Sequence, residues 1–423
     1  MRSPPACMKT DMRAAAPYPD HRKEGGSDAG VGRAIGEFRA CSLLETFQKV
    51  KPHLARLGIT RVASQTGLDR LGIPVWCAFV PNAKAIVIAQ GKGLDEEAAR
   101  VSAVMEAVER VVATEPGCSK QVSTAADHVC GGQRVHTLNG LIARHQAPLR
   151  HDEPVAWVDA DDLSTGGRIS LPFDALDFDR TRLSPRYWQS SDGLASGNTR
   201  DEAILHGLLE RVERDALALW SVSRREFRFT RRIDPQHLKS AALIELLSTI
   251  RMAGLQLALF DITTDLGIPC VAALLAPDDQ SHTIRYAELT LGAGAALEPE
   301  AAIIRAVLET VQSRMTYIAG ARDDLLPSVF DKPADPTHLA AFLSPAAHRV
   351  DDMPVFSAES TRSALDMIVS QLATSQITEL FAVELGYDWL PVSVVKVFAP
   401  QLENPDGARR LRFGPRALSR SLQ

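Results

Sequence analysis

The sequence predicts an α/β protein of the mixed α+β kind, built from internally repeated lobes that each combine a sheet and a helix. Two apolar segments, LGIPVWCAFV at 71–80 and LGIPCVAALL at 266–275, begin with the same Leu-Gly-Ile-Pro turn. Three other segments, starting at Gly91, Ser196 and Gly292, place glycine and an acidic turn before a long helical pattern. Self-similarity of this kind indicates repeated structural units that share a core.

Composition limits the class of protein. The chain has 423 residues, 45% of them hydrophobic, and a net charge of -5. This length and hydrophobic content are enough for a large core. The negative net charge argues against nucleic-acid binding, which usually needs a strongly basic face. No apolar run is long enough for a membrane span or resembles a signal peptide. Six scattered cysteines without a CxxC pair are predicted to be free thiols. We therefore expect a cytoplasmic protein without nucleic-acid or membrane partners.

The elements follow in order along the chain. Residues 1–35 are rich in Pro, Gly, Ala and charge and lack a sustained period, so they are predicted to be a disordered tail. One folded region is expected over 36–423, beginning with a helix in which apolar residues recur from Leu43 to Leu57. Each Leu-Gly-Ile-Pro turn is expected to lead from the end of a helix into a buried strand. The segment 385–398 is a looser third copy.

The three long helices align without gaps and share one polar register. The aligned sets are Ser102, His206 and Arg305; Glu106, Glu210 and Glu309; and Glu109, Glu213 and Gln312. Positions i, i+4 and i+7 lie on one helix face, so each helix carries a polar column. An apolar column beside it, from Val101 to Val112 in the first helix, is predicted to dock on a sheet.

The repeated carboxylates predict a magnesium-nucleotide site. A single helical glutamate is usually solvated. Here the same register occurs three times, without lysine partners at i+4, and gathered carboxylates repel one another unless a cation joins them. Magnesium uses one or two carboxylates together with phosphate oxygens, and helix N-termini with glycine turns would offer N–H groups to phosphate. The basic residues expected to neutralise phosphate are Lys92, Arg110, Arg214, Arg305 and Arg314.

Other kinds of nucleotide site and metal site fit the sequence less well. The sequence has no GxxxxGK[ST] motif and no GxGxxG after a strand with the expected acidic residue, so ATP would bind by another architecture than the P-loop or Rossmann types. A metal-dependent hydrolase would usually have histidine among its ligands, and clustered histidines are nearly absent.

These motifs resemble the three ATP-site motifs of the YcaO superfamily. They are GKG…SAVMEAVER, SDGLASGNTRDEAILHGLLERVERDA and PEAAIIRAVLETVQSR, in the family's order, and the resemblance covers roughly 36–423. It implies a YcaO-type fold with sheet/helix lobes around a nucleotide site. The implied ATP and Mg²⁺ cofactors are bound by Arg39, Ser102, Glu106, Asn198, Glu202, Glu210, Glu213, Arg214, Arg305 and Glu309. The implied metal ligands are Glu106, Glu109, Glu210, Glu213 and Glu309, and the implied catalytic residues are Glu213, Arg214 and Arg305.

The resemblance also implies the reaction. The family activates a peptide backbone amide: a nucleophile adds to the amide carbon, ATP phosphorylates the amide oxygen, and phosphate leaves. A side-chain nucleophile gives an azoline ring, and external sulfide gives a thioamide. The segments GITRVASQTGLDRLGIPV and GPRAL resemble the subgroup that accompanies TfuA-type partners, which is associated with thioamidation.

The resulting expectation is thioamide formation in a peptide or protein substrate, with a TfuA-like partner, an external sulfur donor and a homodimer. The alternatives are an azoline-forming cyclodehydratase and a nucleotide-binding accessory protein. An accessory protein would not need so many mutually repelling carboxylates. The arginine-rich segment 409–420 is interpreted either as a solvated end or dimer contact, or as a lid or partner surface near the nucleotide.

Overall fold

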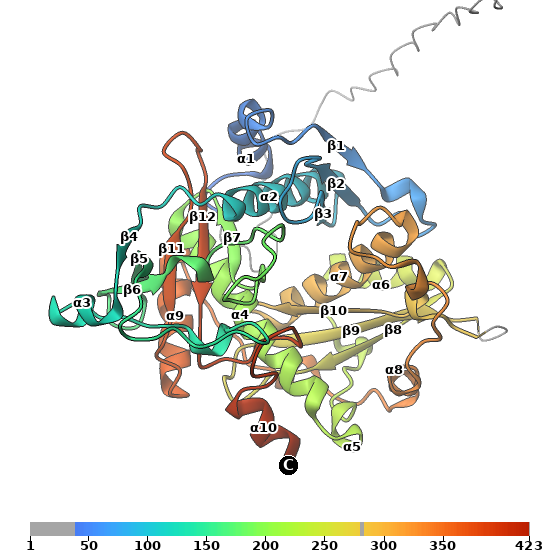
Figure 1. The fold of residues 1–423 in the computed structure, drawn as a ribbon. Helices are drawn as coiled ribbons and strands as arrows, with labels where there is room; N and C mark the ends of the chain where they lie inside the picture. Colours follow the sequence, from blue (N-terminus) through green and yellow to red (C-terminus); the bar gives the residue numbers. More distant parts are fainter. Residues whose placement is uncertain (1–38, 280–282, 423) are drawn as a thin grey trace, which may run out of the picture. The chain divides into compact units, whose positions relative to one another are not determined.

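The computed structural model describes residues 39–279 and 283–422, which belong to the unit Ile35–Gln423. The predicted tail at 1–35 lies outside the described residues. Ten helices are described, and three of them are long (Figure 1). The helices are α1 (Leu43–Val50), α2 (Glu96–Thr114), α3 (Ala125–Cys130), α4 (Arg200–Val222), α5 (Arg225–Arg228), α6 (Ala241–Met252), α7 (Pro299–Ala319), α8 (Pro336–Ala340), α9 (Thr361–Thr374) and α10 (Pro415–Leu422).

The described strands form three antiparallel sheets. The first has the order β1 (Arg61–Ser64), β2 (Val75–Phe79), β3 (Ile88–Lys92), and the second the order β10 (Thr290–Ala295), β9 (Cys270–Pro277), β8 (Leu255–Asp261). The third has the order β4 (Gln121–Ser123), β5 (Val155–Asp162), β11 (Phe381–Glu384), β12 (Ser393–Phe398), β7 (Leu194–Gly197), and β6 (Arg168–Pro172) pairs with β5.

Each long helix follows an edge strand and packs back onto it, which confirms the predicted repeated lobes. Helix α2 follows β3 and packs on β2 and β3, and α7 follows β10 and packs on β10 and β9. Helix α4 follows β7 and packs on β7 and β12. Strand β12 pairs with β7 from a distant part of the chain, so the predicted third copy at 385–398 completes the lobe of α4.

The Leu-Gly-Ile-Pro turns enter strands as predicted, but the predicted helix before each turn is wrong. Gly72 and Gly267 have φ of 66°, and their turns lead into β2 and β9. The elements before them are β1 with a short 3₁₀ turn and β8, so each turn connects antiparallel strands. A left-handed glycine followed by proline reverses the chain after either kind of element, so the local pattern did not identify what comes before.

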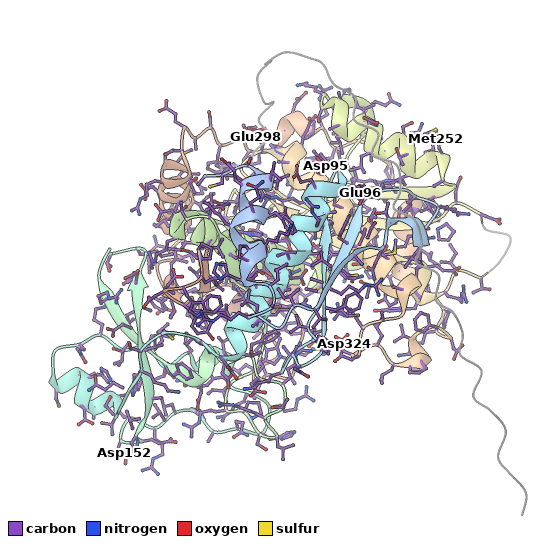
Figure 2. The ribbon with its side chains drawn as sticks, turned by 90° about the horizontal axis from the view of Figure 1, so that it is seen from above. Asp95, Glu96, Asp152, Met252, Glu298 and Asp324 are labelled. Atoms are coloured by element: carbon purple, nitrogen blue, oxygen red, sulfur yellow. The ribbon has the colours of Figure 1, made fainter. Side chains whose placement is uncertain are left out.

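Glycines in the edge strands allow the helices to lie directly on the strand backbone. A Cβ atom at Gly91 would come within 2.0 Å of the Ala103 nitrogen, and one at Gly294 within 2.3 Å of the Ala302 carbonyl oxygen. These glycines therefore allow close helix–strand packing. The sequence interpretation had instead predicted that the glycine turns offer backbone N–H groups to phosphate. The acidic turn caps the helix: Asp95 accepts from the Ala98 N–H at 2.7 Å, and Figure 2 shows it at the start of α2.

The apolar column of each long helix is buried against its sheet, as predicted. In α2 the side chains of Val101, Val108 and Val112 are buried, while the polar column remains partly accessible. Within the described ranges, no helix has both the length and the apolar character to cross a membrane. The five described cysteines carry free thiols.

Candidate functional site

The polar columns of α4 and α7 meet around one guanidinium group. Arg214 Nη1 lies 3.2 Å from a carboxylate oxygen of Glu213 and 3.9 Å from one of Glu309, which comes from α7. Its Nη2 lies 3.3 Å from Glu210, and its Nε lies 3.4 Å from Asp192, just before β7. Arg214 thus holds together four carboxylates from three segments of the chain.

Lys92 connects the first lobe to this cluster. It ends β3, and its Nζ lies 3.4 Å from Glu309 of α7. Burial raises the pKa of Glu309, but Lys92 and Arg214 together hold it below the ordinary value. The side chains of Lys92 and Glu309 are 27% and 25% exposed, so a ligand from solvent can reach them.

Glu109 joins α2 to the lobe of α4. Its carboxylate accepts from the backbone N–H of Ser196 at 2.9 Å and from the Ser196 hydroxyl at 2.6 Å. Burial raises the pKa of Glu109 to about 8, with nearby Glu106 and Glu210 adding to the effect. Burial likewise raises the pKa of Glu213 to about 7. Both carboxyls therefore hold protons near neutral pH, which a divalent cation would displace.

The other predicted glutamates of α2 and α4 have local partners. Glu106 forms an ion pair with Arg110 one turn further along α2. Glu210 also accepts from the Gly193 N–H at 3.0 Å, which fixes its carboxylate beside the turn before β7. The structure thus brings Glu210, Glu213 and Glu309 together around Arg214, and it ties Glu106 to its own helix.

A second group of predicted residues lies where α4 begins and meets α1. Asn198 exchanges hydrogen bonds with the Thr46 hydroxyl at 2.9 and 3.1 Å. Glu202 accepts from the Asn198 N–H at 3.1 Å and from the Ala40 N–H at 3.4 Å. Arg39, which the resemblance implies as a phosphate contact, directly precedes Ala40 in the chain.

The remaining predicted residues lie on α2 and α7. Ser102 lies one turn before Glu106 on α2 and is partly exposed. Arg305 lies one turn before Glu309 on α7, and it donates a hydrogen bond to the Ala295 carbonyl at 3.0 Å.

Two sequence interpretations are corrected by long-range ion pairs. Arg314, predicted to neutralise phosphate, donates to both carboxylate oxygens of Asp69 at 2.8 and 3.2 Å.

Asp215 of α4 lies at 0% side-chain exposure and pairs with Arg416 of α10 at 2.9 Å. Arg409 is buried as well and donates to backbone carbonyls. These two arginines therefore anchor the C-terminal segment, which is neither a wholly solvated end nor a free lid.

Asp192 is a site residue that sequence reasoning missed. It contacts Arg214, and its own backbone N–H and carboxylate are fixed by the Ser190 hydroxyl at 3.1 and 2.6 Å. It lies in a loop, so the helical register that identified the glutamates could not include it. The only available signal was its position in the SDG segment next to the second motif.

The donor set fits a magnesium-bound nucleotide. Carboxylate oxygens are the hard ligands that Mg²⁺ prefers, while Lys92 and Arg214 suit phosphate oxygens. In the structure these two cations lie among the carboxylates, and over residues 39–279 and 283–422 no three Asp, Glu, His or Cys side chains are gathered as a metal-binding group. The residues that would hold the magnesium ions are the glutamates around Arg214 together with Glu109 and Glu106.

The raised pKa of Glu109 predicts that stability falls as pH rises. The folded-state pKa of about 8 lies above the ordinary glutamate value of 4.5. Between these values the folded protein holds a proton that the unfolded chain has lost, so stability falls by up to about 1.4 kcal/mol per pH unit, and the fall ends above the folded-state pKa. We expect Glu109→Gln, whose amide oxygen can still accept from Ser196, to reduce this slope and to be more stable than the unmodified protein at pH 8.

Urea unfolding without nucleotide between pH 5.5 and 8.5 measures this slope. Glu97→Gln is the matched control, because Glu97 lies on the same helix with a side chain 43% exposed. Equal slopes for Glu109→Gln and the control would contradict the assignment.

Comparisons with known proteins agree with the geometry. The family model of YcaO, described as a cyclodehydratase that binds ATP and Mg²⁺, matches residues 90–403. An uncharacterized protein of the tfuA 3' region of Rhizobium leguminosarum bv. trifolii is 35% identical over 389 residues, which are 90% of this chain and 92% of that protein. An uncharacterized protein of Methanothermobacter thermautotrophicus is 33% identical over 370 residues, covering 85% and 93% of the two chains.

Two solved structures share the fold. YcaO from Methanopyrus kandleri, bound with AMPPCP and Mg²⁺, matches with a TM-score of 0.67 and 23% identity over 86% of this chain and 92% of that chain. A heterocyclase in complex with substrate and cofactor matches with a TM-score of 0.72 and 21% identity over 86% of this chain. The chain spans 53% of the length of that heterocyclase.

Proposed function

Because this chain belongs to the YcaO family of ATP- and Mg²⁺-binding proteins, we propose that it uses ATP to activate a backbone amide in a peptide or protein. The observation that carries the proposal is the cluster in which Arg214 joins carboxylates of the α4 and α7 lobes and Lys92 of the first lobe contacts Glu309. A protein that only recognised a peptide would have no need for this concentration of buried, mutually repelling carboxylates.

Each part of the cluster has a role in this reaction. Bound ATP with Mg²⁺ supplies the phosphoryl group that turns the amide oxygen into a leaving group. Glu213 and its neighbouring glutamates provide oxygen ligands and keep the metal in place. Arg214 and Arg305 stabilise the negative charge that develops on the transferring phosphoryl group, and Lys92 offsets charge at the edge of β3. Asp192 and Glu210 orient the Arg214 guanidinium through its Nε and Nη2.

Arg39, Asn198 and Glu202 would bind the nucleotide at the other end of the site. Glu202 accepts a hydrogen bond from Ala40, just before α1, and Asn198 donates one to Thr46 of α1, so both side chains have protein partners without a ligand. Positioning of this kind is the main protein contribution in phosphoryl transfer, because the chemistry itself needs little covalent assistance.

We further propose that the product is a thioamide, formed with an external sulfur donor and a TfuA-like partner. The support is the relative from a tfuA 3' region, which matches 90% of this chain. Ring closure to an azoline is the second candidate, supported by the cyclodehydratase description of the family model. The homodimer remains an expectation from the family resemblance, and the cytoplasmic location a prediction from the sequence.

The experiment that tests the proposal combines the full chain, a TfuA-like protein, ATP, Mg²⁺, sulfide and a library of synthetic peptides. We expect peptide-dependent ATP turnover and, by mass spectrometry, exchange of one oxygen for sulfur. Loss of one water without sulfur uptake would identify the azoline-forming activity instead. ATP turnover that no peptide stimulates, with or without the partner, would contradict amide activation.

A further inference from the structure

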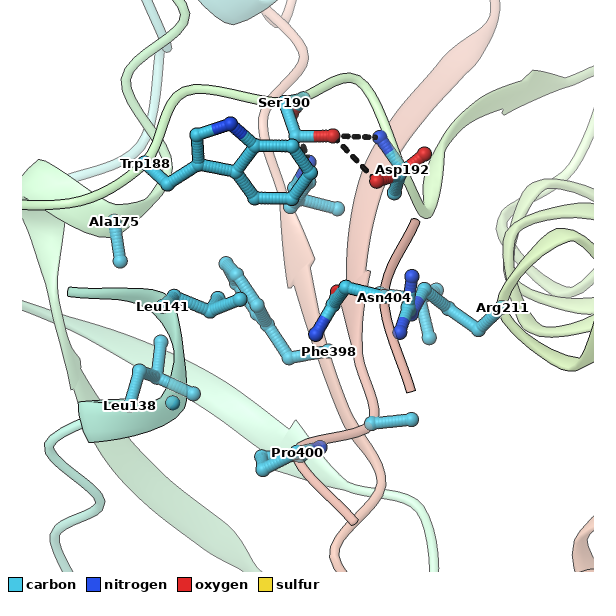
Figure 3. A pocket seen from close by; sticks show the side chains of 14 residues that line it. Leu138, Leu141, Ala175, Trp188, Ser190, Asp192, Arg211, Phe398, Pro400 and Asn404 are labelled. Atoms are coloured by element: carbon cyan, nitrogen blue, oxygen red, sulfur yellow. Dashed lines mark hydrogen bonds between the residues drawn. The ribbon is translucent and has the colours of Figure 1, made fainter. Parts of the chain in front are cut away.

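A small cavity shares Asp192 with the cluster. It has a volume of about 40 Å³ and is bounded by β12, the loop before β7 and α4 (Figure 3). A water molecule needs roughly 10–15 Å³ measured in this way, so the cavity has room for about three water-sized atoms. The apolar part of its wall includes Trp188 and Phe398, and the polar part includes Arg211 and Lys396. The space suits a small ligand and excludes a peptide or a nucleotide.

Arg211 presents an unused donor in the wall of this cavity. Its side chain extends from α4 toward Asn404 in Figure 3, and the residue is only 3% exposed. Nη2 donates to the Glu403 carbonyl at 2.8 Å, whereas Nη1 is buried and has no hydrogen-bond partner in the part of the chain that the structure describes. A buried charged donor without an acceptor is rare in native proteins, because its lost hydration is not replaced.

Lys396 adds a second buried cation to the same wall. The residue is 5% exposed, and its ammonium, which has three N–H donors, gives one hydrogen bond to the Ser190 carbonyl at 2.6 Å. Asp192 supplies the carboxylate of the lining, and it is shared with Arg214 and the Ser190 hydroxyl. Asp192 and Glu210 both act electrostatically on Arg211 and Lys396, and Asp215 acts on Arg211, so the cations have carboxylate neighbours, whereas Arg211 Nη1 still has no hydrogen-bond acceptor among the described residues.

We propose that the cavity binds a small inorganic monoanion between Arg211 and Lys396. Such an anion would accept hydrogen bonds from the unused Nη1–H of Arg211 and from a further N–H of Lys396. Hydrosulfide has this chemistry and fits the size, whereas dihydrogen phosphate shares the chemistry but, with five non-hydrogen atoms, is larger than the space. The proposal concerns the chain without nucleotide, so it does not rest on amide activation.

The test is calorimetric titration of the full nucleotide-free chain with inorganic phosphate and, separately, with hydrosulfide under anaerobic conditions. We expect at least one of the two to bind, and to bind about ten-fold or more weakly to Arg211→Gln and to Lys396→Met. Two variants are used because each removes a different donor, so a folding defect in one leaves the other informative. Arg225→Gln is the matched control, since Arg225 is an exposed arginine just after α4.

The outcomes separate the cavity from the nucleotide site. Binding that persists with saturating Mg·AMPPCP and depends on both Arg211 and Lys396 supports the proposal, and the anion that binds identifies the source. Absence of binding of both anions overturns it. Binding that Mg·AMPPCP abolishes and that both variants retain also overturns it, because the anion would then occupy the phosphate position of the cluster.

Discussion

Glu213→Gln is expected to lose Mg²⁺-dependent ATP binding while it keeps its fold. Glutamine has nearly the size of glutamate, so packing of α4 is preserved, but its neutral amide is a much poorer ligand for Mg²⁺. Loss of an outer partner of a metal ligand already costs about 10–100-fold in affinity, so loss of the ligand itself is expected to cost at least about 100-fold. This expectation rests on the Glu213 carboxylate. It is largely buried, its pKa is raised to about 7, and it contacts Arg214.

Calorimetric titration with ATP, with and without Mg²⁺, measures the effect. Glu97→Gln removes a carboxylate from an exposed position on α2 and should bind as the unmodified protein does. Circular dichroism of both variants checks the fold. If Glu213→Gln binds Mg·ATP as tightly as the control, Glu213 has no role as a ligand.

Arg214→Gln is expected to give the largest loss of stability. The guanidinium contacts four carboxylates, and its removal leaves them facing one another in a partly buried site. Removing one member of a buried ion pair costs about 3–5 kcal/mol, because the remaining charge is uncompensated. The cost should be smaller at pH 6 than at pH 8, since the raised pKa of Glu213 lets it take up a proton.

Urea unfolding at both pH values, with and without Mg²⁺, measures this loss. Mg²⁺ should restore part of the stability of Arg214→Gln, because a divalent cation can take the place of the missing charge among the carboxylates. Arg225→Gln, an exposed arginine, should differ from the unmodified protein by less than about 0.5 kcal/mol. A stability of Arg214→Gln equal to that of the control at pH 8 would show that the cluster does not depend on its cation.

The sequence predicted the features that repeat, and it failed where contacts are single and distant. The shared register of Glu210 and Glu309 placed them on corresponding helix faces, and the structure brings both to Arg214. Register cannot show that β12, near the end of the chain, completes the lobe of α4. Nor can it show that Arg314 pairs with Asp69 or Asp215 with Arg416, because no local pattern records such pairings.

The glycines of the edge strands also determine how the site can move. Because Gly91 and Gly294 bring the strand backbone into direct contact with the helix backbone, α2 and α7 cannot shift toward the strand at these points without a backbone clash. The turns between strand and helix are short, and the one before α2 is capped by Asp95. Each helix and its sheet therefore behave as one rigid body, and any closure around a ligand has to displace whole lobes, with hinges in the segments between them.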